Sequence, residues 1–166
     1  NKESEYNIIT VAWTGTICTN PPMCYISIRP ERHSYSIIKR NMEFVINLTT
    51  AEMAFPTDWC GVRSGKEYHK FEEMKLTPGK CTVVNAPLIE ESPLCIECRV
   101  KEIVSLGSHD MFIADVVNVR ADENHLNPET GKLELAEANP LVYVHGGYYE
   151  LGSKIGKFGW SVEKKK

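Results

Sequence analysis

Along the first half of the chain, short apolar runs separated by turn residues predict β-strands around one helix. Residues 8–18 are rich in β-branched and aromatic side chains without a helical stripe, and residues 23–28 repeat that composition after a Pro-Pro turn. A third strand is expected at residues 43–48. Between the second and third strands, Ser34 is the expected N-cap of a short helix over residues 35–41.

The second half continues with short strands and few helices. Thr49 and Glu52 have capping-box spacing and predict a helix that cannot run cleanly past Pro56. Residues 57–80 are expected to form a long surface loop around a short helix at residues 67–74. Further strands are expected at residues 81–85, 88–91, 94–106, 109–121 and 141–144.

Many short strands at close spacing predict a mainly β barrel rather than a layered α/β fold. We expect one domain over residues 1–166, with residues 155–166 as a partly flexible C-terminal tail. The two longest strands are expected to form a hairpin that turns at Gly107 and Ser108.

Charge and composition narrow the class of protein. The net charge is −3 and the pI is near 6.0, so the basic face of a nucleic-acid binder is not expected. No apolar run approaches the ~20 residues that a membrane helix needs, and no signal-peptide pattern begins the chain. We therefore predict a cytoplasmic protein that binds neither nucleic acid nor membrane.

The six cysteines are expected to be reduced thiols. Cys95 and Cys98 have a spacing that also occurs in metal and redox sites. On a strand, however, residues three apart point to opposite faces, so we interpret both as packing residues. The histidines follow no regular ligand spacing, and we predict no metal site.

The bend at residues 29–34 is a candidate anion site. Arg29 and Arg32 flank a proline-fixed turn and meet the predicted helix start at Ser34. Guanidinium groups and the free N–H groups of a helix start both suit a phosphate. The alternative is that these arginines are surface residues paired with nearby carboxylates.

The first predicted strand is a candidate surface for a flat ligand. Thr10, Thr14 and Thr16 would place hydroxyls on one side of the strand, opposite Val11 and Trp13. An aromatic cofactor ring along this edge would meet hydroxyls and backbone groups. The alternative is an ordinary core strand with a buried tryptophan.

Near the end of the chain, glycines cluster with Tyr148 and Tyr149. They follow a β-rich half rather than joining a strand to a helix, which argues against a dinucleotide-binding loop. We interpret this segment as an aromatic flap or a dimer arm.

Several segments together resemble the FMN-binding, flavin reductase-like split-barrel family, and its flavoredoxin-type members in particular. In chain order they are N-I-I-T-V-A-W-T-G, P-P, S-I-R-P-E-R-H-S-Y-S-I-I, E-F-V-I-N-L, S-G-K-E-Y-H-K-F, H-D-M-F-I-A-D-V-V and Y-Y-E-L-G-S-K-I-G. The resemblance implies a six-stranded antiparallel Greek-key split barrel with a few short helices. It also implies a homodimer with one FMN per subunit near the interface.

The resemblance assigns cofactor-binding roles along the whole chain. Residues of the first strand would line the flavin ring, the bend would follow the ribityl chain and the phosphate, and later residues would complete the site. The residues so implied are Thr10, Val11, Ala12, Trp13, Thr14, Cys18, Ser27, Ile28, Arg29, Arg32, Ser34, Asn47, Lys70 and Tyr148, with Tyr149 as the alternative to Tyr148.

The implied activity is that of an NAD(P)H-dependent flavin reductase that passes a hydride or electrons through bound FMN. The alternatives are an electron carrier with tightly held FMN, served by another redox protein, and a non-enzymatic dimeric flavin-binding module. The segment A-W-T-G replaces the small, serine-rich segment of reductases that release flavin. Because the flavin performs the redox chemistry, no catalytic side chain is predicted.

Overall fold

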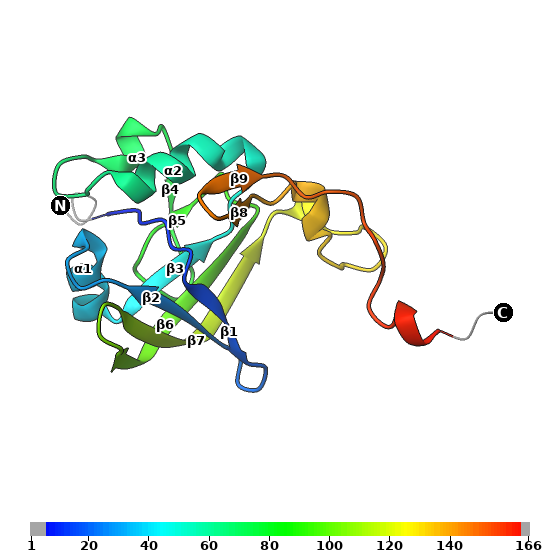
Figure 1. Ribbon diagram of the computed structural model, residues 1–166, viewed down its shortest axis with the longest axis horizontal. Helices are drawn as coiled ribbons and strands as arrows, with labels where there is room; N and C mark the ends of the chain where they lie inside the picture. Colours follow the sequence, from blue (N-terminus) through cyan, green and yellow to red (C-terminus); the bar gives the residue numbers. More distant parts are fainter. Residues whose placement is uncertain (1–5, 164–166) are drawn as a thin grey trace.

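The structure is a computed structural model that describes residues 6–163. Its centre is one curled antiparallel sheet in which the strands follow the order β1-β2-β7-β6-β3 (Figure 1). These strands are β1 (Thr14–Cys18), β2 (Met23–Ile28), β3 (Glu43–Asn47), β6 (Leu94–Ser105) and β7 (Asp110–Ala121). The predicted mainly β, antiparallel architecture is thereby confirmed.

The strand pattern follows the period of two in the sequence. Every second residue of β2 is buried, and Cys24 and Ile26 lie opposite Ala114 and Phe112 of β7. The long β6–β7 hairpin turns at Gly107, whose φ of 98° suits a residue without a side chain. The predicted hairpin is therefore confirmed.

Apolar side chains on the inner face of the sheet form the main core. This core contains Cys24, Ile26, Ile28, Ile38, Phe44, Cys98, Val100, Phe112 and Ala114. Cys95 lies in a second cluster with Cys81, Val84 and Leu88. The two cysteines of the Cys95–Cys98 pair thus pack in different clusters, as predicted from their places on a strand.

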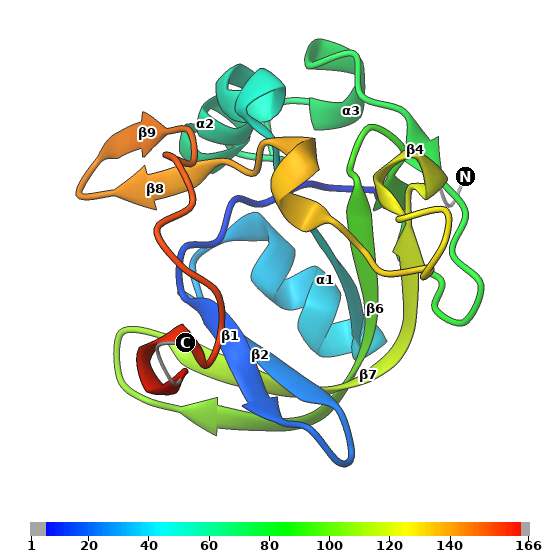
Figure 2. The same cartoon turned by 90° about the vertical axis from the view of Figure 1, so that its right-hand side faces the viewer.

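Helix α1 (His33–Asn41) lies across one end of the curled sheet (Figure 2). Ile38 faces the core, and the helix ends at Met42, which has a φ of 57°. The prediction that Ser34 caps this helix is wrong. Arg32 occupies the N-cap position without a side-chain hydrogen bond, and Ser34 is buried within the first turn.

The segment after β3 differs from the prediction. A 3₁₀ turn, η2 (Ala51–Met53), leads directly into α2 (Ala54–Val62). Pro56 lies in the first turn of α2, where the missing N–H breaks no α-helical bond within that helix. The predicted helix break at Pro56 is therefore wrong, and α3 (Lys70–Glu73) is shorter than the helix expected there.

The predicted strand at residues 81–85 is absent. Carboxylates hold this segment instead: Glu97 accepts the N–H groups of residues 82–84, and Glu43 accepts that of Asn85. A small ladder joins β4 (Pro78–Gly79) to β5 (Leu88–Ile89). β5 lies beside β3, but Asn47 Oδ1 rather than a backbone ladder accepts the Ile89 N–H, so the described barrel sheet has five strands instead of six.

The last quarter of the chain, after β7, lies outside the barrel sheet. It contains the 3₁₀ turns η3 (Glu123–His125) and η4 (Leu135–Ala138), followed by a hairpin of β8 (Val142–Val144) and β9 (Gly147–Tyr149) beside α2. A final 3₁₀ turn, η5 (Trp160–Val162), follows an extended segment. Within residues 6–163, no helix combines the length and apolarity needed to cross a bilayer.

Candidate functional site

A cavity of about 960 Å³ lies between the N-terminal segment, β3, α2 and the β8–β9 hairpin. Its walls include residues 6–12, residues 43–49 and Tyr148. A second hollow of about 360 Å³ adjoins it, and the two share walls formed by Asn7, Ser34 and residues 60–62. The pair of hollows can take an elongated ligand with chemically different ends.

The smaller hollow is positively charged. Arg32, Arg63 and Lys70 line it, next to the start of α1. They outnumber the one acidic residue of its wall, Glu31, which pairs with Arg29. Partial burial, together with the positive charges of Lys66 and Lys70, lowers the pKa of His33 at this position. The positive electrostatic potential of this hollow favours the binding of an anion.

Lys70 is a buried cation on the wall of this hollow. It is only 3% exposed, and its Nζ donates to the carbonyl oxygens of Ile8 (2.7 Å) and Cys60 (2.6 Å). Burial lowers its pKa, and no carboxylate pairs with it among the described residues. An ammonium group has three donors, so one remains after the two carbonyls. Buried charges are normally paired, so this lysine predicts an anionic partner.

The start of α1 adds neutral donors. The first backbone N–H groups of a helix have no partner inside it, and no acidic residue occupies this first turn. The hydroxyl oxygen of Ser34 accepts a hydrogen bond from Asn7 Nδ2 at 2.7 Å. Its own proton therefore remains available, and the hollow combines cationic and neutral donors as a phosphate site does.

At the larger cavity, residues 9–12 form an extended wall with free backbone groups. Within the described range, residues 9–12 make no hydrogen bond with other backbone groups. The first strand begins only at Thr14, so the predicted strand at residues 8–18 is correct for its second half alone. Free donors and acceptors along a cavity wall suit the polar edge of a flat heterocycle.

The hydroxyl groups of Thr10 and Thr14 form hydrogen bonds within the protein. Thr10 Oγ1 donates to the carbonyl of Thr57 at 2.5 Å, and Thr14 Oγ1 donates to that of Tyr25 at 2.8 Å. These bonds fix the cavity wall against α2 and β2. The backbone of the segment is therefore better placed than its hydroxyl protons to recognise a ligand.

Two further predicted residues lie on the cavity wall. Asn47 lines it from the end of β3, although its side-chain oxygen holds the N–H of Ile89 at 2.9 Å. Tyr148 lines it from β9 and donates to Asp58 Oδ1 of α2 at 3.0 Å. Partial burial, with Asp58 nearby, raises the pKa of Tyr148, so this phenol stays protonated at neutral pH.

Some of the predicted residues lie outside both hollows. Ile28 is buried in the core, and Ser27 donates its N–H to the carbonyl of Trp13 at 2.8 Å. Arg29 is exposed and pairs with Glu31 at 2.9 Å, which matches the alternative interpretation for that arginine. Trp13 and Cys18 are exposed, and the Trp13 ring lies 5.8 Å from that of His109, so the core-tryptophan alternative does not hold. Contact of these five residues with a cofactor stays a prediction.

The structure also brings residues to the site that the sequence did not single out. Asn7, Arg63 and Gly61 line the smaller hollow, and Asp58 lines the larger one. The stretch around Arg63 was predicted only as polar loop. Its four-residue run Arg63–Lys66 contains two cations, and that is the signal that could have identified it.

Within the described residues, His, Cys, Asp and Glu side chains form no group of three or more that could hold a metal ion. Cys60 lines both hollows, but burial raises its thiol pKa, which disfavours a thiolate nucleophile. The site therefore offers binding and positioning groups around a ligand that must bring its own chemistry.

The comparisons with known proteins fit this picture. Residues 1–152 match the family model described as a flavin reductase-like domain. The flavoredoxin of Desulfovibrio vulgaris (Miyazaki F) is 27% identical with a TM-score of 0.87, covering 95% of this chain and 85% of that one. A flavin reductase with a split barrel domain from Shewanella frigidimarina is 24% identical with a TM-score of 0.81, covering 93% and 78%, which shows the split-barrel fold.

Among curated relatives, the NADH-dependent FMN reductase RutF of Pseudomonas syringae is 29% identical over 139 residues, which are 84% of this chain and 68% of that protein. Two archaeal relatives, from Archaeoglobus fulgidus and Pyrococcus abyssi, match over 113 residues. These matches span 64% of the archaeal proteins' lengths.

Proposed function

The chain belongs to the flavin reductase-like family, and on that premise we propose that it binds FMN in the two adjoining hollows and acts as an oxidoreductase. The observation that carries the proposal is the buried, carboxylate-free ammonium of Lys70 in a cationic hollow beside a larger cavity with free backbone groups. FMN has a dianionic phosphate at one end and a flat heterocycle at the other. The phosphate therefore matches the smaller, cationic hollow, and the heterocycle matches the larger cavity.

The residues present fit this cofactor. Arg32, Lys70, Ser34 and the first N–H groups of α1 would hold the phosphate. The backbone of residues 10–12 would face the ring, with Asn47 and Tyr148 on the surrounding wall. When bound, FMN supplies the reversible uptake of a hydride or of single electrons. The protein residues bind the cofactor, orient it and keep water from its buried face.

The proposed reaction is reduction of the flavin by NAD(P)H. No protein acid or base is needed for a direct hydride transfer, which agrees with a site made of binding groups. The similarity to flavoredoxin and to an NADH-dependent FMN reductase supports an electron-transferring function of this kind. Assembly as a homodimer and a cytoplasmic location stay predictions.

A second candidate is an electron carrier that receives electrons from another protein. The 27% identity and TM-score of 0.87 with a flavoredoxin favour it. In that case the FMN would stay bound through the cycle, and NAD(P)H would not reduce it rapidly. The third possibility is a dimeric module that binds flavin without turning it over.

One anaerobic titration distinguishes these functions. Purified protein is loaded with FMN, freed of excess cofactor and mixed with NADH or NADPH while the flavin absorbance is recorded. We expect rapid bleaching. Slow bleaching that becomes fast with dithionite would favour the carrier or the non-enzymatic module over the reductase, and failure to retain or bind FMN would overturn the proposed function.

A further inference from the structure

The larger cavity opens to solvent where the β8–β9 hairpin lies beside α2 (Figure 2). Asp58 of α2 and Tyr143 of β8 line the cavity and are also exposed. Tyr148 of β9 lines it too and is half-buried. These three residues form the mouth of the cavity. Their side chains are the groups that a second ligand would meet as it enters.

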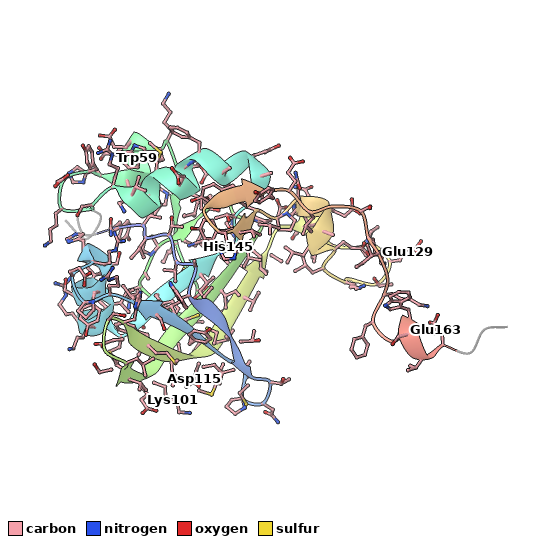
Figure 3. All side chains as sticks on the ribbon, in the orientation of Figure 1. Trp59, Lys101, Asp115, Glu129, His145 and Glu163 are labelled. Atoms are coloured by element: carbon pink, nitrogen blue, oxygen red, sulfur yellow. The ribbon has the colours of Figure 1, made fainter. Side chains whose placement is uncertain are left out.

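The two tyrosine rings of the mouth form a pair on one face of the hairpin. Tyr143 and Tyr148 lie directly opposite each other in the β8–β9 ladder, so their side chains share a face. Their ring centroids are 5.4 Å apart, at an interplanar angle of 51°. Tyr149 follows on β9 and belongs to the opposite face. Neither Tyr149 nor the turn residue His145, which is labelled in Figure 3, lines the cavity.

Asp58 holds this ring pair in place and has a free carboxylate oxygen. Its Oδ1 accepts the hydrogen bond from Tyr148 at 3.0 Å. Within residues 6–163, its Oδ2 accepts no hydrogen bond, and no cationic side chain forms an ion pair with Asp58. One oxygen of an exposed carboxylate is therefore available to a ligand.

No cation on the cavity wall opposes this carboxylate. Among the described residues, the lining of the larger cavity contains no Lys, Arg or His, and its other acid, Glu43, pairs with Arg99 at 3.4 Å. The segment of residues 122–150, which includes the hairpin, has six acidic residues against one lysine. The potential at the mouth is therefore negative, opposite in sign to that of the smaller hollow, and it attracts cations.

A carboxylate beside aromatic rings is suited to an organic cation. The face of a tyrosine ring attracts a cation that lies within about 6 Å of its centroid. The raised pKa of Tyr148 keeps its phenol neutral, so Asp58 supplies the only negative charge among the three residues. We propose that Asp58, Tyr143 and Tyr148 form a binding site for a flat aromatic cation, such as an N-alkylated pyridinium or quinolinium ion.

This site would select the ligands that reach the larger cavity. With the FMN phosphate in the smaller hollow, the two ends of the site would hold opposite charges. A second substrate with a neutral or cationic ring would pass the mouth, whereas an anionic ring would be repelled. Only this consequence rests on the proposed function. The cation site itself rests on Asp58 and the tyrosine pair.

Binding of a matched pair of probes tests the proposal. The probes are 1-methylquinolinium and quinoline, which differ by a methyl group and a positive charge at neutral pH. Ligand-observed NMR titration of the full chain measures both affinities. We expect the cation to bind about threefold or more tightly than quinoline, because only the cation gains from the carboxylate and the ring faces. Equal affinities, or no binding of the cation, overturn the proposal.

Asp58→Asn tests the charge of the mouth. This change removes the charge but keeps an oxygen that can accept the hydrogen bond from Tyr148, so the hairpin stays in place. It should weaken 1-methylquinolinium binding about threefold or more and leave quinoline binding unchanged. Glu102→Gln makes the same change in net charge at an exposed position of β6 and should affect neither probe. An equal loss in both variants would mean attraction to the overall charge of the protein and would overturn the site.

Tyr143→Leu tests the ring pair, because it keeps apolar bulk and removes one aromatic face. We expect it to reduce the preference for the cation over quinoline. Tyr149→Leu alters the other face of the hairpin and should retain that preference, and equal behaviour of the two variants overturns the assignment. FMN titration of the same samples separates the two proposals. A chain that binds FMN without preferring the cation overturns only the cation site, and the converse result overturns only the proposed function.

Discussion

At the scale of single residues, charge placement separates two arginines that look equivalent in the sequence. Arg32 lines the smaller hollow, whereas Arg29 is turned to solvent and pairs with Glu31. Arg32→Ala should weaken FMN binding by about 1–3 kcal/mol, the usual loss for a charge-assisted hydrogen bond. Fluorescence titration of FMN measures this loss. Arg29→Ala is the comparison variant and should cost less FMN affinity, because the Arg29 guanidinium already pairs with Glu31, and the reverse order would contradict this ranking.

Glu97 is a buried charged residue that connects β6 to the segment before β5. It is 1% exposed, and its carboxylate accepts hydrogen bonds from Asn118 and from the backbone of residues 82–84. Burial alone would raise the pKa of Glu97, but these donors outweigh it and the pKa is lowered. The resulting stability is present above the pKa of the unfolded chain and is lost as pH falls through the lower folded pKa.

Glu97→Gln should therefore lower the free energy of unfolding by about 1–3 kcal/mol at pH 7, because it weakens four hydrogen bonds to a buried charge. Its stability should also depend less on pH below 5 than that of the wild type. Urea unfolding at several pH values measures both effects. Glu102→Gln alters an exposed acid of the same strand and should change neither, and equal acid sensitivity of all three proteins would contradict this role.

At the scale of elements, the loop carrying Gly65, between α2 and α3, packs against Asn7 of the N-terminal segment and His33 of α1. A Cβ at Gly65 would collide with the side-chain oxygen of Asn7 and lie 2.8 Å from His33 Cδ2. Gly65→Ala should therefore disturb the Asn7–Ser34 hydrogen bond and cost about 1–3 kcal/mol through overpacking. Thermal unfolding and FMN titration should both reveal the change. Gly152→Ala, where no atom lies within 4 Å, is the control, and equal behaviour of the two variants would contradict this packing.

The β8–β9 hairpin is held to α2 by the hydrogen bond from Tyr148 to Asp58. Tyr148→Phe should free the hairpin while leaving the barrel intact, because one hydrogen bond contributes only about 0.5–1.5 kcal/mol. Hydrogen exchange should accelerate at residues 142–149 without a large change in the melting temperature. Tyr149→Phe alters an exposed neighbour and should not change exchange. Uniform exchange across all three proteins would show that the bond does not restrain the hairpin.

The elements also show which parts of the fold are readable from sequence. Strand β2 and the first half of β7 follow simple periodicity because their alternate residues are buried in a shared core, whereas β6 has register shifts at Glu97/Cys98 and Val100/Glu102. The first half of the predicted strand at residues 8–18 was wrong, since its apolar residues line a cavity wall instead of pairing with another strand. β-propensity does not distinguish a paired strand from an unpaired cavity wall, because both place β-branched residues in an extended backbone.

The candidate site was only partly predictable from the sequence. Arg32, Ser34 and residues 10–12 line the hollows, and the Asn7–Ser34 bond links the two segments. The side of the bend that faces the hollow depends on how α1 docks on the sheet, which no local pattern encodes. The role of Lys70 as a buried cation likewise arises from the packing of α3 against the carbonyls of Ile8 and Cys60.

At the scale of the whole molecule, the site is assembled from distant segments, so its ligand should stabilise the entire barrel. The hollows draw on the N-terminal segment, α1, β3, α2, the Gly65 loop and the β8–β9 hairpin. A ligand that binds only the folded chain stabilises it by about 2.7 kcal/mol at one hundred times its dissociation constant. For a chain of this length, that should raise the melting temperature by about 5–11 °C.

Riboflavin is the matched ligand for this measurement, because it has the ring and the ribityl chain of FMN but no phosphate. It can occupy the larger cavity and leaves the ammonium of Lys70 without an anion. At equal concentrations we therefore expect FMN to raise the melting temperature clearly more than riboflavin, and the difference to shrink in Arg32→Ala. Equal shifts with both ligands would place the binding energy in the ring alone. They would contradict the role of Lys70, the buried and carboxylate-free cation of α3, as a binding group for the phosphate.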